Sequence, residues 1–131
     1  MVDIADGERN YHVFYQMLTD PQIVAEWALP PAPELAILSS GGAVAAVDGV
    51  SDAKEFLVLR RALEVFGLPQ SEQAGVWRVL AAVLLLGNIP FRVAGGGGGG
   101  QGEGDGEVAE IADEGRLRLS CVALGCDPGL Y

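Results

Sequence analysis

The sequence predicts a mainly α-helical fold with a short β-hairpin that bears a glycine-rich loop. Apolar residues recur at helical spacing in several segments, and proline or glycine separates these segments. Two short extended segments flank a single run of glycines. Half of the 131 residues are hydrophobic, which is enough for one core. These observations indicate one folded body with a flexible insert at residues 95–106.

Two helices are expected near the N-terminus. Asp6 is the expected cap of the first, and its apolar stripe consists of Tyr11, Phe14, Tyr15 and Leu18. A second, short helix is expected at residues 21–28, because Asp20 can cap it and Pro21 suits the first helical position. The prolines at 30, 31 and 33 should end it, and residues 39–50 are expected to form a loop.

Three further helices are expected after residue 50. Ser51-Asp52 with Glu55 resembles a capping box, which predicts a helix up to Phe66 that Gly67 closes. Residues 70–86 should form a long helix that becomes apolar on all sides and is therefore expected to be buried all round. A strand at 88–93 should pair with 107–111, before a helix at 114–124 that ends at Gly125. Asp127-Pro128 could then begin another helix.

Composition restricts the partners. Eight basic and 18 acidic residues give a net charge of −10, which argues against a nucleic-acid groove or an anionic membrane surface. The longest apolar run, residues 79–86, is far shorter than the roughly 20 residues of a membrane-spanning helix. The N-terminus shows no secretory signal, so an intracellular location is expected. Cys121 and Cys126 lack metal-site spacing and are expected to be reduced thiols.

The glycine run does not match a phosphate-binding loop. Such a loop needs a lysine and a hydroxyl residue after its last glycine, whereas acidic residues follow here. Those carboxylates also lack the regular ladder of an EF-hand calcium site. His12, the single histidine, has no nucleophile placed beside it by the sequence, which favours a structural role over a general base. Taken alone, these residues specify no catalytic, cofactor or metal site.

Four blocks resemble the motor domain of myosins. Residues 8–18, ERNYHVFYQML, resemble the family segment ERN[FY]H[IV]FYQLL. In the family's order follow residues 49–67, GVSDAKEFLVLRRALEVFG; residues 81–91, AAVLLLGNIPF; and residues 121–127, CVALGCD. Leu85 departs from the usual histidine of this third block. The signature residues of the resemblance are Glu8, Arg9, Asn10, Tyr11, His12, Phe14, Tyr15, Gln16, Gly87 and Asn88.

The resemblance implies that residues 1–131 are a partial myosin motor domain from the upper actin-binding subdomain of the α/β P-loop motor fold. The phosphate-binding GESGAGKT and switches I and II do not occur in this sequence, so no catalytic residue can be carried over. ATP and Mg²⁺ are implied for the intact motor, and the chain alone is expected to bind neither and to be inactive.

The implied partners are the actin filament and the remainder of the motor domain, in a cytoplasmic, cytoskeleton-associated complex. The insert occupies the place of a variable surface loop that approaches actin in the family, which makes Glu103, Asp105 and Glu107 candidates for an actin-facing loop. Actin is itself acidic, so these carboxylates should not attract it. The alternative is a non-catalytic helical interaction module or a truncated myosin remnant.

Overall fold

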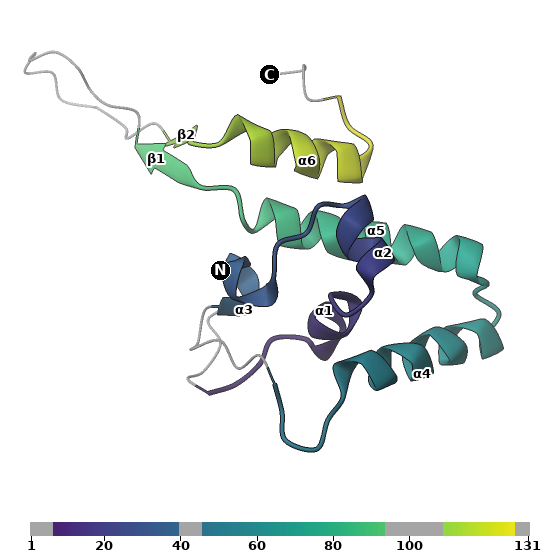
Figure 1. Ribbon diagram of the computed structural model, residues 1–131. Helices are drawn as coiled ribbons and strands as arrows, with labels where there is room; N and C mark the ends of the chain where they lie inside the picture. Colours follow the sequence, from purple (N-terminus) through teal and green to yellow (C-terminus); the bar gives the residue numbers. More distant parts are fainter. Residues whose placement is uncertain (1–6, 40–45, 94–108, 128–131) are drawn as a thin grey trace, which may run out of the picture.

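A long central helix, α5, organises the molecule (Figure 1). The computed structural model describes residues 7–39, 46–93 and 109–127. The helical elements are α1 (His12–Met17), α2 (Pro21–Glu26), the 3-10 turn η1 (Ala32–Glu34), α3 (Ala36–Ser39), α4 (Asp52–Val65), α5 (Gln70–Leu86) and α6 (Glu114–Leu124). Figure 1 shows α6 along one side of α5 and α1 and α4 on the other side, with α2 overlapping α5 in this view. The mainly helical prediction is therefore confirmed.

The described residues also include one two-stranded sheet. Strands β1 (Phe91–Val93) and β2 (Ala109–Ile111) are antiparallel, with Phe91 opposite Ile111 and Arg92 opposite Glu110. This confirms the predicted pairing at the base of the hairpin. The predicted flexible insert at 95–106 lies outside the described residues, and so does the part of the predicted last helix that follows Asp127.

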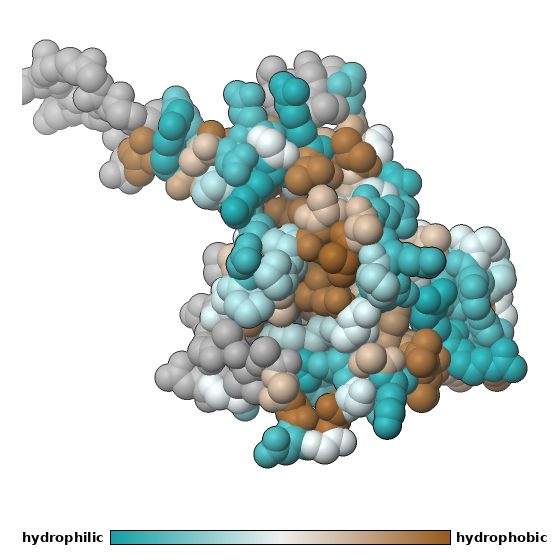
Figure 2. Space-filling model, viewed as in Figure 1, coloured by the Kyte–Doolittle hydropathy of each residue, from teal (hydrophilic) through white to brown (hydrophobic). Residues whose placement is uncertain are grey.

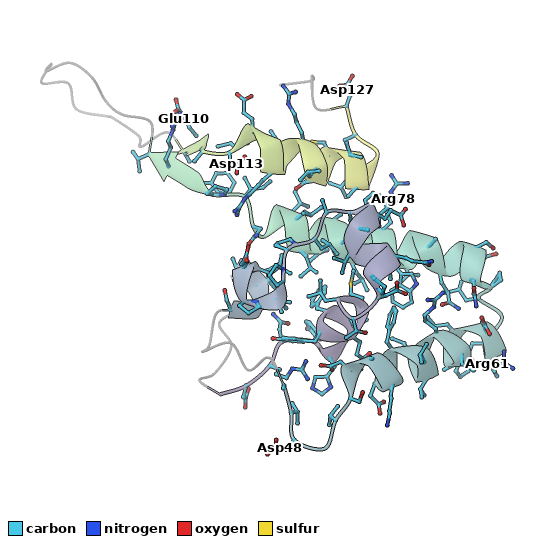
Figure 3. All side chains as sticks on the ribbon, viewed as in Figure 1. Asp48, Arg61, Arg78, Glu110, Asp113 and Asp127 are labelled. Atoms are coloured by element: carbon cyan, nitrogen blue, oxygen red, sulfur yellow. The ribbon has the colours of Figure 1, made fainter. Side chains whose placement is uncertain are left out.

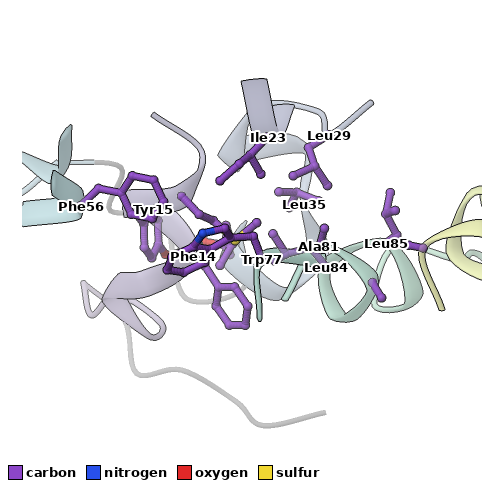
Figure 4. Close-up of a cluster of buried hydrophobic side chains, with 14 residues drawn as sticks. Phe14, Tyr15, Ile23, Leu29, Leu35, Phe56, Trp77, Ala81, Leu84 and Leu85 are labelled. Atoms are coloured by element: carbon purple, nitrogen blue, oxygen red, sulfur yellow. Dashed lines mark hydrogen bonds between the residues drawn. The ribbon is translucent and has the colours of Figure 1, made fainter. Parts of the chain in front are cut away.

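One hydrophobic core joins α5 to the N-terminal helices (Figure 4). Trp77 of α5 meets Phe56 of α4 edge to face, with ring centroids 4.9 Å apart. Such a contact contributes about 1 kcal/mol beyond the area that it buries. The other fully enclosed members include Met17, Leu35, Leu38 and Leu84. Because these residues come from α1, α3, α5 and the link before α3, the core fixes short helices that would not be stable alone.

Local capping explains where several helices begin and end. The Asp20 carboxylate accepts a hydrogen bond from the Gln22 amide at 2.9 Å, as expected for the start of α2. Asp113, at the start of α6 in Figure 3, accepts from the Arg116 amide at 3.1 Å. At the other end of α6, Gly125 has a φ of 73°, the left-handed conformation that closes many helices.

Four expectations about the helices are wrong. Helix α1 begins at His12 rather than after Asp6, because Arg9 and Asn10 turn their side chains toward distant elements; Asp6 itself lies outside the described residues. Helix α2 ends at Glu26, since Ala28 takes a φ of 48°. Ser51 precedes α4 without a side-chain capping bond, so the capping box does not form. Ser39 belongs to α3 rather than to a loop.

Helix α5 has the expected bounds but is not buried all round. Trp77, Ala81 and Leu84 are enclosed, whereas Val79 is 58% exposed and Val83 40% exposed. The described elements pack on only part of its circumference, and Figure 2 shows hydrophobic surface across the middle of the molecule and again over α4. The sequence indicated correctly that the later part of α5, residues 79–86, is apolar on every side, but it could not show which sides find a partner.

Candidate functional site

Arg9 forms a buried ion pair at the start of α4. Its Nη2 lies 2.8 Å from one carboxylate oxygen of Asp52 and its Nη1 lies 3.3 Å from the other, a two-bond arrangement that fixes the guanidinium plane. The Arg9 side chain is only 3% exposed and that of Asp52 16%. The guanidinium carbon also lies 3.8 Å from the centre of the Tyr15 ring. Arg9 therefore ties the entry of α1 to the N-terminus of α4.

Asn10 and Tyr15 extend this connection to α3. The Asn10 amide nitrogen Nδ2 donates to the Ile37 carbonyl at 2.9 Å, while its Oδ1 accepts from the Tyr11 backbone at 2.7 Å. The Tyr15 hydroxyl donates to the Leu38 carbonyl at 3.3 Å. These bonds satisfy carbonyls at the end of a four-residue helix that has few internal partners.

Asn88 forms the second polar connection, at the end of α5. Its Oδ1 accepts from the Ala36 backbone at 2.8 Å and its Nδ2 donates to the Glu34 carbonyl at 3.0 Å. The Asn88 carbonyl accepts from Arg116 of α6 at 2.9 Å. Three segments therefore meet at one buried residue, which sets the direction in which the chain leaves α5 toward β1.

Gly87, which follows α5, allows α3 to lie close against the end of that helix. A Cβ at Gly87 would overlap the Cδ1 atom of Ile37. Asn88 thus binds the start of α3 and Gly87 lies against its Ile37, while Asn10 and Tyr15 bind carbonyls at its end. The four residues act on the same short helix from segments far apart in the sequence.

The remaining signature residues are placed less centrally. Phe14 is buried in the core, Gln16 is half-buried, and Glu8, Tyr11 and His12 are exposed. Glu103, Asp105 and Glu107 lie outside the described residues. The sequence placed Asp52 in a helix cap and in the second family block and gave Arg116 no role, because nothing local marks a partner 43 or 28 residues away.

Most of the polar side-chain atoms at these connections bind other parts of the described chain; the Nε of Arg9 is buried without a hydrogen-bond partner. Among the described residues, no three histidine, cysteine, aspartate or glutamate side chains gather as they would around a metal ion. In the same part of the chain, no helix is long and apolar enough to span a membrane. Hydrogen bonds from Gln70 and then Arg61 lower the pKa of Glu64, which lies at the far end of α4. The arrangement positions backbone segments relative to one another.

Comparison with known proteins identifies the fold to which these connections belong. The family model described as myosin head (motor domain) matches residues 1–128. The chain belongs to the myosin head family. It is 37% identical over 124 residues to the myosin-K heavy chain of Dictyostelium discoideum, and 43% identical over 88 residues to the myosin ID heavy chain of the same organism. Over 88 residues it is 40% identical to myosin-7 of Arabidopsis thaliana.

The similarity covers most of this chain but little of the relatives. The aligned region is 93% of this chain and 13% of the myosin-K heavy chain, and 67% of this chain and 5% of myosin-7. The myosin resemblance of the four sequence blocks is thus confirmed. The chain spans about an eighth or less of the length of these myosins.

Proposed function

We propose that residues 1–131 are one part of the motor domain of an actin-based, ATP-driven myosin. The observation that carries this proposal is the match of the myosin head model to nearly the whole chain. Similarity to three myosins over 66% to 93% of this chain supports it and disfavours a non-catalytic helical interaction module or a truncated remnant. The activity, the ATP and Mg²⁺ sites and the cytoplasmic, cytoskeletal location are proposed for the complete motor, with nucleotide bound by segments other than residues 1–131.

The role of this part of the motor is to hold backbone geometry. The pair between Arg9 and Asp52 and the bonds of Asn88 each join elements that lie far apart in the sequence. Buried polar contacts of this kind favour one arrangement over its alternatives, because each displaced group would lose its partner. Arg9, Asn10, Tyr15, Gly87 and Asn88 are therefore proposed as positioning residues for α3, α4 and the base of the hairpin, with no direct part in ATP hydrolysis.

The insert between the two strands is proposed to approach actin in the complete motor. The antiparallel pairing of β1 and β2 brings the ends of the insert together. Its carboxylates Glu103, Asp105 and Glu107 should weaken contact with an acidic filament. Replacing all three by the corresponding amides should tighten actin binding at low ionic strength and have less effect at high ionic strength. An unchanged affinity in a cosedimentation assay would remove this loop from the actin interface.

The proposed function is tested by extending the reading frame. Long-read sequencing of the transcript should show GESGAGKT upstream and DxxGFE downstream in the same frame, and the encoded motor domain should hydrolyse MgATP faster when actin is added. The 131-residue chain by itself should show no turnover above background. A frame without these motifs, or a motor domain with no actin-activated ATPase, would contradict the proposal.

A further inference from the structure

The end of α6 carries both cysteines of the chain, at the two positions that its closing hydrogen bonds join. The Cys126 backbone N–H donates to the Cys121 carbonyl at 2.8 Å, and the Gly125 N–H donates to the Val122 carbonyl at 3.1 Å. With Gly125 in the left-handed conformation, these bonds form the Schellman motif that ends many helices. The side chains of the two residues that the first bond joins commonly contact each other in this motif. Here, those two residues are Cys121 and Cys126.

The first of these bonds limits the distance between the two cysteines. With standard backbone bond lengths, a bond of 2.8 Å keeps the Cα atoms of Cys121 and Cys126 within about 6.7 Å of each other. Disulfides join residues whose Cα atoms lie about 4.4–6.8 Å apart. The backbone separation therefore satisfies the requirement for a disulfide. Both cysteines are free thiols, so the structure shows the reduced form of the pair.

The two thiols differ in their access to solvent. Cys121 is only 4% exposed, whereas Cys126 is exposed. An oxidant that arrives from solvent therefore reaches Cys126 first. Redox-sensing sites commonly combine an accessible cysteine that meets the oxidant with a neighbouring cysteine that resolves the product. The difference in burial assigns the first role to Cys126 and the second to Cys121.

Arg78 of α5 fixes the end of α6 on which both thiols lie. Its Nε donates to the Ala123 carbonyl, and its Nη2 lies so close to Gly125 that a Cβ there would overlap it. Figure 3 shows Arg78 next to this end of α6. Helix ends that lack such contacts fray. Because this end is bound to the neighbouring helix, the short separation of the two cysteines is a property of the folded chain.

We propose that Cys121 and Cys126 form a peroxide-sensitive dithiol site that closes to a disulfide across the end of α6. The Cys126 thiolate attacks one oxygen of hydrogen peroxide; the O–O bond breaks, the departing hydroxide takes a proton to form water, and Cys126 becomes a sulfenic acid. The Cys121 sulfur then attacks the Cys126 sulfur, the S–O bond breaks, and the hydroxyl group leaves as water with the Cys121 proton. The two thiols together lose two electrons, and one peroxide is reduced to two waters. The site is independent of the proposed motor function, because it needs only α5, α6 and the end of α6.

Peptide mapping after brief exposure to hydrogen peroxide tests this chemistry. Both cysteines fall in the tryptic peptide 119–131, so the disulfide appears as that peptide with two hydrogen atoms lost and no uptake of iodoacetamide. In the folded 131-residue chain, this product should exceed the sulfinic and sulfonic acids of Cys126 by at least about 10-fold. Dimedone should capture the sulfenic acid of Cys126 in C121S, which lacks the resolving thiol. Mainly sulfinic acid, or a disulfide between two chains, in the native protein would overturn the proposal.

A displaced thiol supplies the matched control. In the double variant C126S/V122C, the accessible thiol moves to position 122, where Val122 is 60% exposed. This position is adjacent to Cys121 in the sequence, but adjacent residues of a helix do not face each other. The variant should therefore react with dimedone after peroxide treatment without forming the disulfide. If it forms the disulfide as readily as the native chain, proximity in the sequence is sufficient, and the proposal fails.

A glutathione titration tests whether the fold holds the two thiols together. Mixtures of reduced and oxidised glutathione set the equilibrium between the dithiol and the disulfide. The folded chain should be half-oxidised in a mixture at least about 10-fold more reducing than the mixture that half-oxidises the same chain in concentrated urea. Gly125→Val keeps both thiols but disfavours the left-handed conformation and overlaps Arg78, so its value should move toward that of the unfolded chain. Equal values for the native chain with and without urea would overturn the proposal, whether or not G125V folds.

Discussion

Removing Arg9 should destabilise the chain strongly, since it leaves Asp52 without its partner. The Arg9 side chain is 3% exposed and makes both of its carboxylate bonds in a largely dry environment. Breaking a buried pair from one side costs about 3–5 kcal/mol. Asp52 keeps some access to water, and the Nε of Arg9 has no hydrogen-bond partner, so the lower end of that range applies. We expect Arg9→Ala to lower the free energy of unfolding by about 3 kcal/mol.

A double-mutant cycle tests the origin of this loss. Urea unfolding followed by circular dichroism gives the free energy for the native chain, R9A, D52A and the double variant. Because the two side chains bind each other, the double variant should be about 2 kcal/mol less destabilised than the sum of the single variants. Where R9A leaves too little folded chain to measure, Arg9→Lys retains the charge but loses the two-bond geometry and the flat contact with Tyr15.

An exposed ion pair on α4 supplies the control. Arg61 pairs with Glu64 at the same 2.8 Å, but its side chain is 76% exposed. R61A should therefore cost no more than about 0.5 kcal/mol. If R9A and R61A destabilise the chain equally, or if the R9A and D52A losses are additive, then the buried pair is not the connection that joins α1 to α4.

Three other outcomes follow from the same contacts. Asn88→Ala should lower the free energy of unfolding by about 1–3 kcal/mol, because two part-buried backbone groups lose their partners; a loss below about 0.5 kcal/mol in urea unfolding would show that water replaces them. Gln70 and then Arg61 hold the folded pKa of Glu64 below its ordinary 4.5, so this stabilisation is fully present above that pH and is lost as the pH falls through the folded value. The urea midpoint of native protein should therefore fall more steeply in acid than that of Glu64→Gln, and parallel curves would exclude the effect. On α5, Leu84→Ala should cost about 2–5 kcal/mol, whereas Val79→Ala should cost under about 1 kcal/mol because Val79 is largely exposed; equal losses would mean that α5 is enclosed on both sides.

Signals in neighbouring residues were sufficient to predict the bounds of helices whose ends depend on residues close to them in the sequence. The bounds of α5 and α6 agree with the sequence prediction, because proline or a cap marks their starts and glycine follows their ends. The pairing of β1 with β2 was also predictable, since the insert leaves two short extended segments to meet. In each case the deciding residues lie within a few positions of the boundary.

Distant partners decided the elements that the sequence did not predict. Helix α1 starts late because Arg9 and Asn10 bind groups 43 and 27 residues away, which removes them from the helix. Helix α3 lies between two prolines and a loop in the sequence, and it is held by Asn88 from 52 residues away. A pattern confined to neighbouring residues cannot contain these contacts. The resemblance to myosins marked Arg9, Asn10 and Asn88 as signature residues but did not indicate what they bind.

The exposed sides of α4 and α5 show a second limit of prediction from the sequence. The periodicity of α5 predicted burial on every side, and Val79 and Val83 are instead exposed in this chain. Such a pattern reports the environment of a helix in the whole domain, and the matched myosins extend far beyond these residues. Exposed apolar surface on both helices therefore agrees with membership in a larger motor domain, whereas a helical module that functions alone would be expected to carry polar residues there. On the proposed function, the sides of α5 that disagree with the sequence prediction are those where the remainder of the motor domain would pack.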